Sequence, residues 1–258
     1  MALTQAQIRD KLKTASFGLK VYAFDTIDST NNCAKALANV GAEEGVVVFS
    51  EHQSAGRGRF NRSWESEREK NLTFSVVLRP AWCARVSLLP FLVACAIAKA
   101  VEEVTGLPVI SKWPNDLLCN GKKFCGILLE ITGNADGVEF VVAGIGINVN
   151  QSAFSQELAS RATSLKNVAA KEIDRISLLQ ECLRQLERYY TGAQKRGFSK
   201  VMREWNARCM MFGRTISVEQ NGSIIKGTAQ KVDADGALVI QSENQTIRVL
   251  AGDVSVLE

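Results

Sequence analysis

Two glycines alternate with two arginines after a predicted strand, in the run Gly56-Arg57-Gly58-Arg59. Glycine lets a backbone turn tightly and approach a ligand closely. Arginine supplies charge-assisted hydrogen bonds, often two at once, to a carboxylate or a phosphate. Trp64 follows and offers a flat apolar face on which a ring could pack. The run therefore favours a loop that closes over an anionic ligand, and a solvated basic loop without a ligand is the alternative.

The sequence argues against several familiar catalytic sites. The glycine-arginine run begins like a dinucleotide fingerprint, but Asn61 stands in place of the third glycine and no apolar helix follows. There is no G-x-x-x-x-G-K-[ST] motif, which excludes a P-loop. His52 is the only histidine, which disfavours Ser-His-Asp and Cys-His catalysis. The seven cysteines form no C-x-x-C pair and indicate free thiols in a reducing compartment, not a zinc site or a disulfide framework.

Three further segments place polar residues at or near strand ends. In the first, Pro114 fixes the backbone beside Lys112, Asn115 and Asp116. The lysine could neutralise a phosphate, and the carboxylate could accept a proton or assist a metal. A strand end followed by an Asn-Asp turn is the structural alternative.

Glycines mark the other two segments. Lys123 begins a predicted strand and Gly126 lies inside it, a position that often marks a ligand or backbone pressed against the strand. Gly144 and Asn148 lie at the end of a later strand and favour a ligand wall. The structural alternatives are a hairpin whose lysines face water and a β-bulge, respectively.

The run Asp28-Ser29-Thr30-Asn31-Asn32 is typical of a helix N-cap. Its hydroxyls and amides could also face a ligand that needs hydrogen-bond donors and acceptors at once.

Hydrophobic periodicity predicts the elements that position these segments. Strands are expected at 21–24, 46–50, 72–78, 109–113, 124–131 and 138–143, and helices at 5–14, 31–39, 88–104 and 198–209. Another helix is expected after a capping box of Ser177 and Gln180. Short β runs follow at 215–218, 223–231, 237–240 and 246–250. We therefore expect two domains, residues 1–211 and a small β-barrel of residues 212–258.

Composition sets broader limits. The 258 residues are 46% hydrophobic and carry a net charge of +4, which suits a globular protein with an anionic small ligand and not a nucleic-acid binder. The longest apolar run, Leu88–Ala98, is too short to span a bilayer core of roughly 30 Å. The polar N-terminus has no signal-peptide pattern, and it is too short for a helix-turn-helix domain. These features predict a soluble cytoplasmic protein.

Five of the segments occur in the order typical of one enzyme family. They are Ser29-Thr30-Asn31, Gln53 with residues 55–59, residues 112–116, Lys123 with Gly126, and Gly144 with Asn148. From about Val21 onward the chain resembles biotin protein ligases (biotin–[acetyl-CoA-carboxylase] ligases), in the form without an N-terminal DNA-binding domain. The resemblance implies an α+β fold: a mixed, mainly antiparallel sheet with flanking helices, as in class II synthetases, and a small C-terminal SH3-like β-barrel.

The resemblance also implies an activity. Such enzymes join biotin to ATP, giving biotinyl-5′-AMP and pyrophosphate, and pass biotin to a lysine of the biotin carboxyl carrier domain of a carboxylase. Mg²⁺ is expected on the ATP phosphates, with no firmly assigned protein ligand. Neither DNA nor a membrane is expected as a partner, and a homodimer is compatible with the family.

Residue roles follow from the same resemblance. The implied catalytic residues are Lys123, Arg59, Lys112 and Asp116. Biotin is expected to bind to Ser29, Thr30, Asn31, Gln53, Gly56, Arg57, Gly58, Arg59, Lys123, Gly126 and Gly144. ATP and the adenylate are expected to bind to Arg57, Arg59, Trp64, Lys112, Asn115, Lys123 and Asn148. Lys123 would hold the biotin carboxylate. Asp116 is the candidate for guiding the acceptor amine as it loses its proton, and substrate desolvation is the alternative for that task.

The chain departs from the family pattern at two places. Asn61 stands where relatives often carry glycine, beside Phe60, so the loop is expected to fold differently over the adenylate. The last residues, 253–258, contain no arginine, which leaves open what the small domain contributes to ATP binding.

Two competing functions are a lipoate ligase or octanoyltransferase of the same fold, and an RNA-binding protein that uses the arginines with Phe60 and Trp64. The polar set around Ser29 and Gln53 favours biotin over an apolar lipoyl ring. A single arginine loop on a chain of net charge +4 disfavours RNA.

Overall fold

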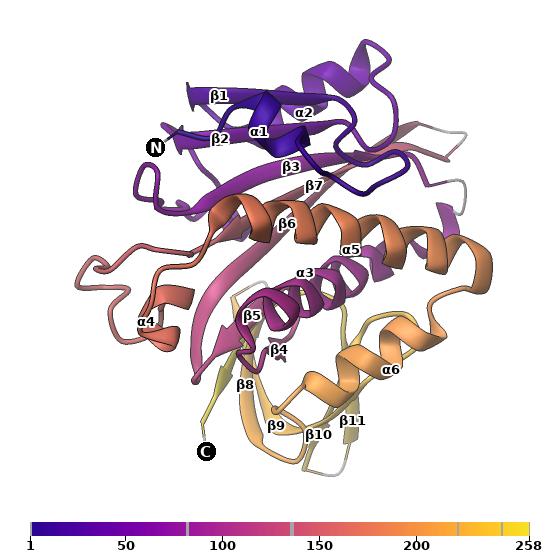
Figure 1. Ribbon diagram of the computed structural model, residues 1–258. Coiled ribbons are helices and arrows are strands. Elements are labelled where there is room, and N and C mark those ends of the chain that lie inside the picture. Colours follow the sequence, from indigo (N-terminus) through magenta and orange to yellow (C-terminus); the bar gives the residue numbers. More distant parts are fainter. Residues whose placement is uncertain (1, 81–82, 135–136, 221, 244, 258) are drawn as a thin grey trace.

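The computed structural model describes residues 2–80, 83–134, 137–220, 222–243 and 245–257. The chain forms a seven-stranded sheet with helices on both faces, followed by a five-stranded antiparallel sheet (Figure 1). This arrangement confirms the predicted α+β architecture. No helix within the described ranges is long and apolar enough to cross a membrane.

The large sheet has the strand order β1-β2-β3-β7-β6-β5-β4. Of the neighbouring pairs in it, β1 and β2 run parallel and the others run antiparallel. The strands are β1 (Val21–Ile27), β2 (Val47–Gln53), β3 (Leu72–Leu78), β4 (Ile110–Lys112), β5 (Asp116–Cys119), β6 (Lys122–Asn134) and β7 (Gly137–Ile147).

Helices cover both faces of this sheet. On β7, Phe140 and Val142 pack in a small core under helix α2 (Thr30–Asn39). The residues between and beyond them, such as Val141 and Ala143, belong to the main core on the opposite face. Because neither face meets water, the strand is apolar at nearly every position.

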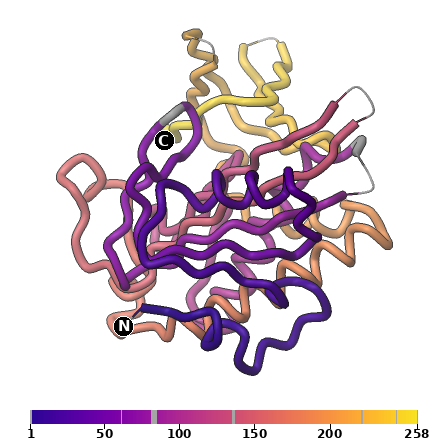
Figure 2. Tube along the Cα trace, turned by 90° about the horizontal axis from the view of Figure 1, so that it is seen from above, coloured from indigo at the N-terminus to yellow at the C-terminus, as the bar shows by residue number. Residues whose placement is uncertain are grey.

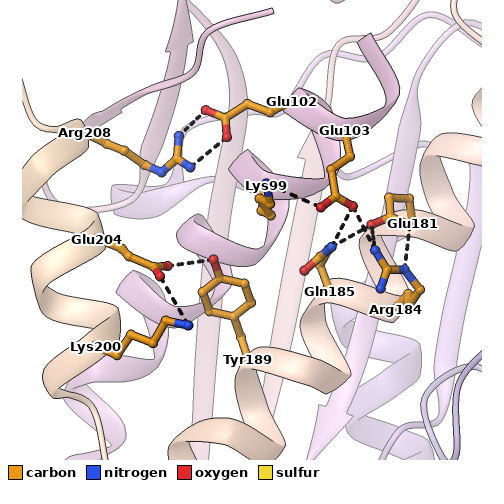
Figure 3. A network of polar contacts seen from close by, with 10 residues as sticks. All are labelled: Lys99, Glu102, Glu103, Glu181, Arg184, Gln185, Tyr189, Lys200, Glu204 and Arg208. Carbon is orange, nitrogen blue, oxygen red and sulfur yellow. Dashed lines mark hydrogen bonds and ion pairs between the residues drawn. The ribbon is translucent and has the colours of Figure 1, made fainter. Parts of the chain in front are cut away.

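Three long helices build the main core with the opposite face of the sheet. They are α3 (Leu89–Thr105), α5 (Arg175–Arg196) and α6 (Ser199–Arg208). Polar contacts fasten the three helices to one another (Figure 3). Arg208 of α6 forms an ion pair with Glu102 of α3, and the Tyr189 hydroxyl of α5 donates to Glu204 of α6 over 2.7 Å. The shorter helical segments are α1 (Gln5–Arg9), η1 (Arg59–Asn61), η2 (Cys83–Leu88) and α4 (Leu165–Ala169).

The C-terminal sheet has the order β11-β10-β9-β8-β12. Its strands are β8 (Thr215–Gln220), β9 (Ser223–Val232), β10 (Leu238–Ser242), β11 (Gln245–Val249) and β12 (Asp253–Val256). The buried Trp113 donates from its indole N–H to the Gly236 carbonyl over 3.1 Å. Gly236 has a φ of +88°, and a Cβ there would lie 2.7 Å from Phe91 of α3. These contacts hold the C-terminal sheet against α3 and the turn that follows β4.

Two predicted helix boundaries were wrong, the end of the first helix and the start of α5. The first helix ends at Arg9 and not at residue 14. The capping box at Ser177 is not the start of α5, because the helix begins two residues earlier, at Arg175. Asp174 is the N-cap, and its carboxylate accepts hydrogen bonds from the backbone N–H groups of Ile176 and Ser177. An aspartate at this position competes successfully with serine because its charge also favours the helix N-terminus.

The structure also differs from the strand predictions near the site. The strand expected at 109–113 ends at Lys112, and after a short turn with a cis Trp113–Pro114 bond the chain returns as β5, which begins at Asp116. The turn after the strand end, which was the structural alternative for this segment, is therefore present as the turn of a β-hairpin. The alternative of a β-bulge at 144–148 was wrong, because β7 pairs regularly through Ile147. Sequence patterns did not predict β12.

The fold makes one pH-dependent prediction. Burial alone would raise the pKa of Glu187, but N–H groups of Ala15, Phe17 and Ser16 donate to its carboxylate and lower the pKa. A lowered pKa stabilises the fold above the unfolded-state pKa, roughly 4.3, and this stability is lost as the pH falls through the folded-state pKa. We expect Glu187→Gln to lower the free energy of unfolding by about 1 kcal/mol at pH 7.

Urea denaturation at pH 7 and at pH 3 measures this effect. The difference between wild type and Glu187→Gln should shrink at pH 3. The matched control is Glu43→Gln, which changes an exposed carboxylate. A difference that stays constant with pH would show that the ionised carboxylate does not hold residues 15–17.

Candidate active site

A cleft of about 1210 Å³ lies against the large sheet, beneath residues 56–64, which we call the arginine loop, and beside the C-terminal sheet. Figure 2 shows the last strand of the chain, in yellow, close to this purple loop. The cleft brings together every predicted site residue except Gly56: Ser29, Thr30, Asn31, Gln53, Arg57, Gly58, Arg59, Trp64, Lys112, Asn115, Asp116, Lys123, Gly126, Gly144 and Asn148. Gly56 lies just outside, where a Cβ would meet the Trp64 carbonyl at 2.8 Å.

The first part of the cleft is a polar group at the start of α2. The predicted N-cap lies in the run 28–32, and the structure places it at Ser29, whose side chain makes no cap hydrogen bond within the described residues. Gln53 of β2 takes over that role, because its Oε1 accepts from the Thr30 backbone N–H over 2.7 Å and from the Thr30 hydroxyl over 3.0 Å. Hydroxyl and amide groups therefore line the cleft with their orientation set by helix capping.

A buried hydroxyl extends this polar group into the sheet. Ser75 of β3 is fully buried, and its Oγ lies 2.8 Å from Thr30 Oγ1 and 2.6 Å from Asn31 Oδ1. A Cβ at Gly144 on the neighbouring strand would overlap the Asn31 amide, so glycine is required there for steric reasons. Sequence analysis missed Ser75 because it lies in a strand that reads as apolar.

A pair of glycines forms the floor under Trp64. Gly126 of β6 and Gly146 of β7 are paired across the sheet. A Cβ at Gly126 would lie 2.9 Å from the indole, and one at Gly146 would overlap it. Trp64 thus packs on bare backbone, and its buried indole N–H has no partner within the described residues. Gly146 was not among the predicted site residues, although the alternation with Gly144 was a signal for it.

The β5–β6 hairpin provides a lysine and a carboxylate. Lys123 Nζ lies 2.7 Å from Asp116 Oδ1, and both side chains are partly exposed to the cleft. The same Nζ lies 5.8 Å from the centre of the Trp64 ring. Lys112 is opposite Asp116 in the β4–β5 register and also lines the cleft. This arrangement leaves net positive charge beside the cleft.

Two other side chains of the cleft each have a buried oxygen atom with no hydrogen-bond partner among the described residues. Asn148 donates from Nδ2 to the Thr163 carbonyl over 3.2 Å, which leaves its buried Oδ1 without a partner among the described residues. The buried Ser111 hydroxyl is unpaired in the same sense. Both line the cleft. Because an unpaired buried polar atom is costly, both atoms are suited to bind a ligand or water. Asn115 instead donates to the Ile127 carbonyl over 2.7 Å and fixes the hairpin.

Arg57 attaches one side of the arginine loop to the polar group. Its Nη2 donates to Asn32 Oδ1 over 2.7 Å and lies 3.4 Å from Glu130 Oε1. Glu130 was not predicted as a site residue, although a carboxylate interrupting an apolar strand was a signal.

The C-terminal sheet holds the other side of the loop. Arg59 donates to the Gly252 carbonyl over 3.2 Å, and Arg62 forms an ion pair with Asp253 of β12. Burial lowers the pKa of Arg59, and the nearby Asp253 opposes this shift. The C-terminal sheet therefore places a carboxylate next to the arginine loop. Phe60 adopts a φ of +55° and is exposed.

No cysteine lines the cleft within the described part of the chain. Burial raises the pKa of Cys119, beside the hairpin, to about 12, and it raises the pKa of Cys125 further. Such thiols stay protonated and unreactive at neutral pH. The described residues also contain no group of three side chains that could hold a metal ion. The chemistry open to this site is the binding and activation of anions by positioning and positive charge.

Two family models match the chain. Residues 23–150 match the "Biotin/lipoate A/B protein ligase family", and residues 211–257 match the "Biotin protein ligase C terminal domain". The two matches cover the large sheet with its arginine loop, and the C-terminal sheet.

Curated relatives and solved structures agree with these matches. The chain is 34% identical to the bifunctional ligase/repressor BirA of Bacillus subtilis, over 98% of this chain and 79% of that protein. It is 32% identical to a biotin–[acetyl-CoA-carboxylase] ligase of Mycobacterium tuberculosis, over 98% and 95% of the two chains. A biotin protein ligase from Aquifex aeolicus, solved with biotin and ATP, superposes with a TM-score of 0.81 at 26% identity, over 92% and 98% of the two chains. The chain therefore belongs to the biotin protein ligase family.

Proposed function

We propose that this protein is an ATP-dependent biotin–[biotin carboxyl-carrier protein] ligase. One observation carries the proposal: a single cleft joins a hydroxyl–amide group, a lysine beside a carboxylate and an arginine loop. The relatives named for biotin ligation and the Aquifex complex with biotin and ATP support the choice of substrates. A lipoate ligase of the same fold is the second candidate, but its apolar ring does not need the polar group around Thr30 and Gln53.

In the first step a biotin carboxylate oxygen attacks the α-phosphorus of ATP. A P–O bond forms to biotin as the bond to pyrophosphate breaks, giving biotinyl-5′-AMP. Lys123 would hold the carboxylate, while Arg59 and Lys112 would steady the phosphates. Arg57, Trp64, Asn115 and Asn148 would contact the adenylate. Charge stabilisation and orientation suffice for such a step, so no protein nucleophile is needed.

Biotin would bind with its cyclic urea at the start of α2. A urea carries two N–H donors and one carbonyl acceptor, which Ser29, Thr30, Asn31 and Gln53 can match. Gly56, Gly58, Gly126 and Gly144 would allow close approach of backbone to the ligand. Mg²⁺ would be held chiefly by the ATP phosphates, which suits a site whose described residues offer no cluster of metal ligands.

In the second step the amine of an acceptor lysine attacks the acyl carbon of the adenylate. A C–N bond forms, AMP leaves, and the amine loses a proton. Free lysine has a pKa of roughly 10.4, so a nearby base assists. Asp116 is the proposed acceptor of that proton, because it is the carboxylate paired with Lys123.

The acceptor would be the biotin carboxyl carrier domain of a carboxylase. Residues 1–211 would carry the catalytic site, and residues 212–258 would support the arginine loop through Asp253. The buried free thiols support a reducing, cytoplasmic compartment. A homodimer and the absence of DNA and membranes as partners stay predictions from the family resemblance.

The proposal is tested with purified protein, Mg²⁺ and ATP labelled at the α-phosphate, with biotin in one reaction and lipoate in another. Labelled adenylate should form with biotin only. An adenylate formed with lipoate alone would transfer the assignment to lipoate ligases, and none with either would refute the ligase function.

Lys123→Ala should reduce the rate of biotinyl-AMP formation by about 10²-fold or more, because it removes the cation next to the reacting carboxylate. The rate of pyrophosphate release measures this step. The control is Lys122→Ala, which changes the adjacent lysine, whose ammonium instead donates to the Ala159 carbonyl. Equal rates in the two variants would remove Lys123 from the first step.

Asp116→Asn should slow transfer to the carrier lysine by about 10²-fold, the usual contribution of a general base. Adenylate formation should fall much less. Single-turnover transfer from enzyme-bound adenylate separates the two steps. Unchanged transfer would show that substrate desolvation, and not Asp116, promotes loss of the proton.

A further inference from the structure

Glu130 of β6 connects the buried polar group to the arginine loop. Its Oε2 accepts from Asn31 Nδ2 over 2.7 Å, and its Oε1 lies 3.4 Å from Arg57 Nη2. The Glu130 side chain is 30% exposed, whereas Asn31 is 4% exposed. One carboxylate therefore reaches from the interior of the sheet to a loop at the surface.

The contact with Asn31 determines the direction of the neighbouring hydrogen bonds. An ionised carboxylate can only accept, so the Asn31 amide must turn its Nδ2 toward Glu130 and its Oδ1 toward Ser75. Ser75 has one hydroxyl hydrogen within reach of two oxygens, Thr30 Oγ1 and Asn31 Oδ1. The amide oxygen can only accept, and it takes that hydrogen.

The same direction extends to Thr30. Since Ser75 gives its hydrogen to Asn31, the Thr30 hydroxyl must itself donate, and its acceptors are Ser75 Oγ at 2.8 Å and Gln53 Oε1 at 3.0 Å. The Thr30 oxygen then keeps a lone pair for a donor in the cleft, which it lines. A urea N–H is such a donor.

We propose that Glu130 is a positioning residue that sets the hydrogen-bond polarity of the urea site and, through Arg57, anchors the arginine loop over it. The inference rests on the proposed function for the identity of the ligand, but not for the anchoring of the loop. No contact of Glu130 with substrate is required.

Glu130→Gln tests both roles. Glutamine keeps the size of the side chain but adds an amide donor. The Asn31 amide can then turn over without losing its partner, and the ion pair with Arg57 is lost. The matched control is Glu139→Gln on β7, an exposed glutamate whose carboxylate accepts from Asn134.

The first measurement needs no ligand. Trypsin cleavage at Arg59 and Arg62 reports how often the loop opens. Glu130→Gln should speed this cleavage about threefold, as expected for the loss of a partly exposed ion pair, and Glu139→Gln should not. In an Arg57→Ala background, Glu130→Gln should cause no further increase, because the partner is already gone.

The second measurement is the kinetics of biotinyl-AMP formation. Glu130→Gln should raise the KM for biotin about fivefold or more and change kcat less than twofold, since the reacting groups are untouched. If Glu130 had only a structural role, Glu130→Gln would lower the melting temperature. The apparent kcat would then fall in proportion to the fraction of unfolded protein. Circular dichroism of each variant checks that the fold is intact.

Unchanged loop cleavage in Glu130→Gln would overturn the anchoring role, and an unchanged KM would overturn the polarity role. Equal effects from Glu139→Gln would overturn both. If the wild-type protein makes no biotinyl-AMP, the proposed function fails, whereas the cleavage experiment still decides the Glu130–Arg57 contact.

Discussion

An ammonium group is costly to hold in a half-closed cleft unless a carboxylate lies beside it, and Asp116 does so for Lys123 at 2.7 Å. The β5–β6 hairpin pairs Asp116 with Gly126 and Leu118 with Lys123, and the two charged side chains meet across it. Asn115 fixes the turn before the hairpin by donating to the Ile127 carbonyl. The ion pair positions the lysine without occupying all of its hydrogens. A ligand carboxylate can therefore join the ammonium, and the proposed two-step reaction uses both members of the pair.

The other parts of the cleft are the glycine floor, Trp64 and the arginine loop. Gly126 and Gly146 remove the side chains that would keep Trp64 off the sheet, and Trp64 in turn ends the arginine loop. The loop is anchored from both sheets, by Glu130 through Arg57 and by Asp253 through Arg62. Residues far apart in the sequence thus hold the positively charged arginines at one side of the cleft. Adenylate chemistry needs this arrangement of charge.

Local patterns predicted much of this molecule. The strand at 72–78 has the predicted bounds, and the motif residues converge on one cleft because strand ends and helix starts meet there. Helix ends were less predictable, since Asp174 and Ser177 are both good caps and only packing decides between them. Ser75 and Asp253 were missed because their partners lie distant in sequence. No local pattern reports a hydrogen bond to residue 31 or an ion pair with residue 62.

The central claim is that Lys123 serves the first step and Asp116 the second. The most direct test supplies preformed biotinyl-5′-AMP to the Lys123→Ala and Asp116→Asn variants and follows transfer to a biotin carboxyl carrier domain. The account predicts that Lys123→Ala, unable to form the adenylate, transfers biotin within about tenfold of the wild-type rate, whereas Asp116→Asn remains about 10²-fold slow. Equal impairment of both variants would contradict it, because the pair would then act as one unit in both steps.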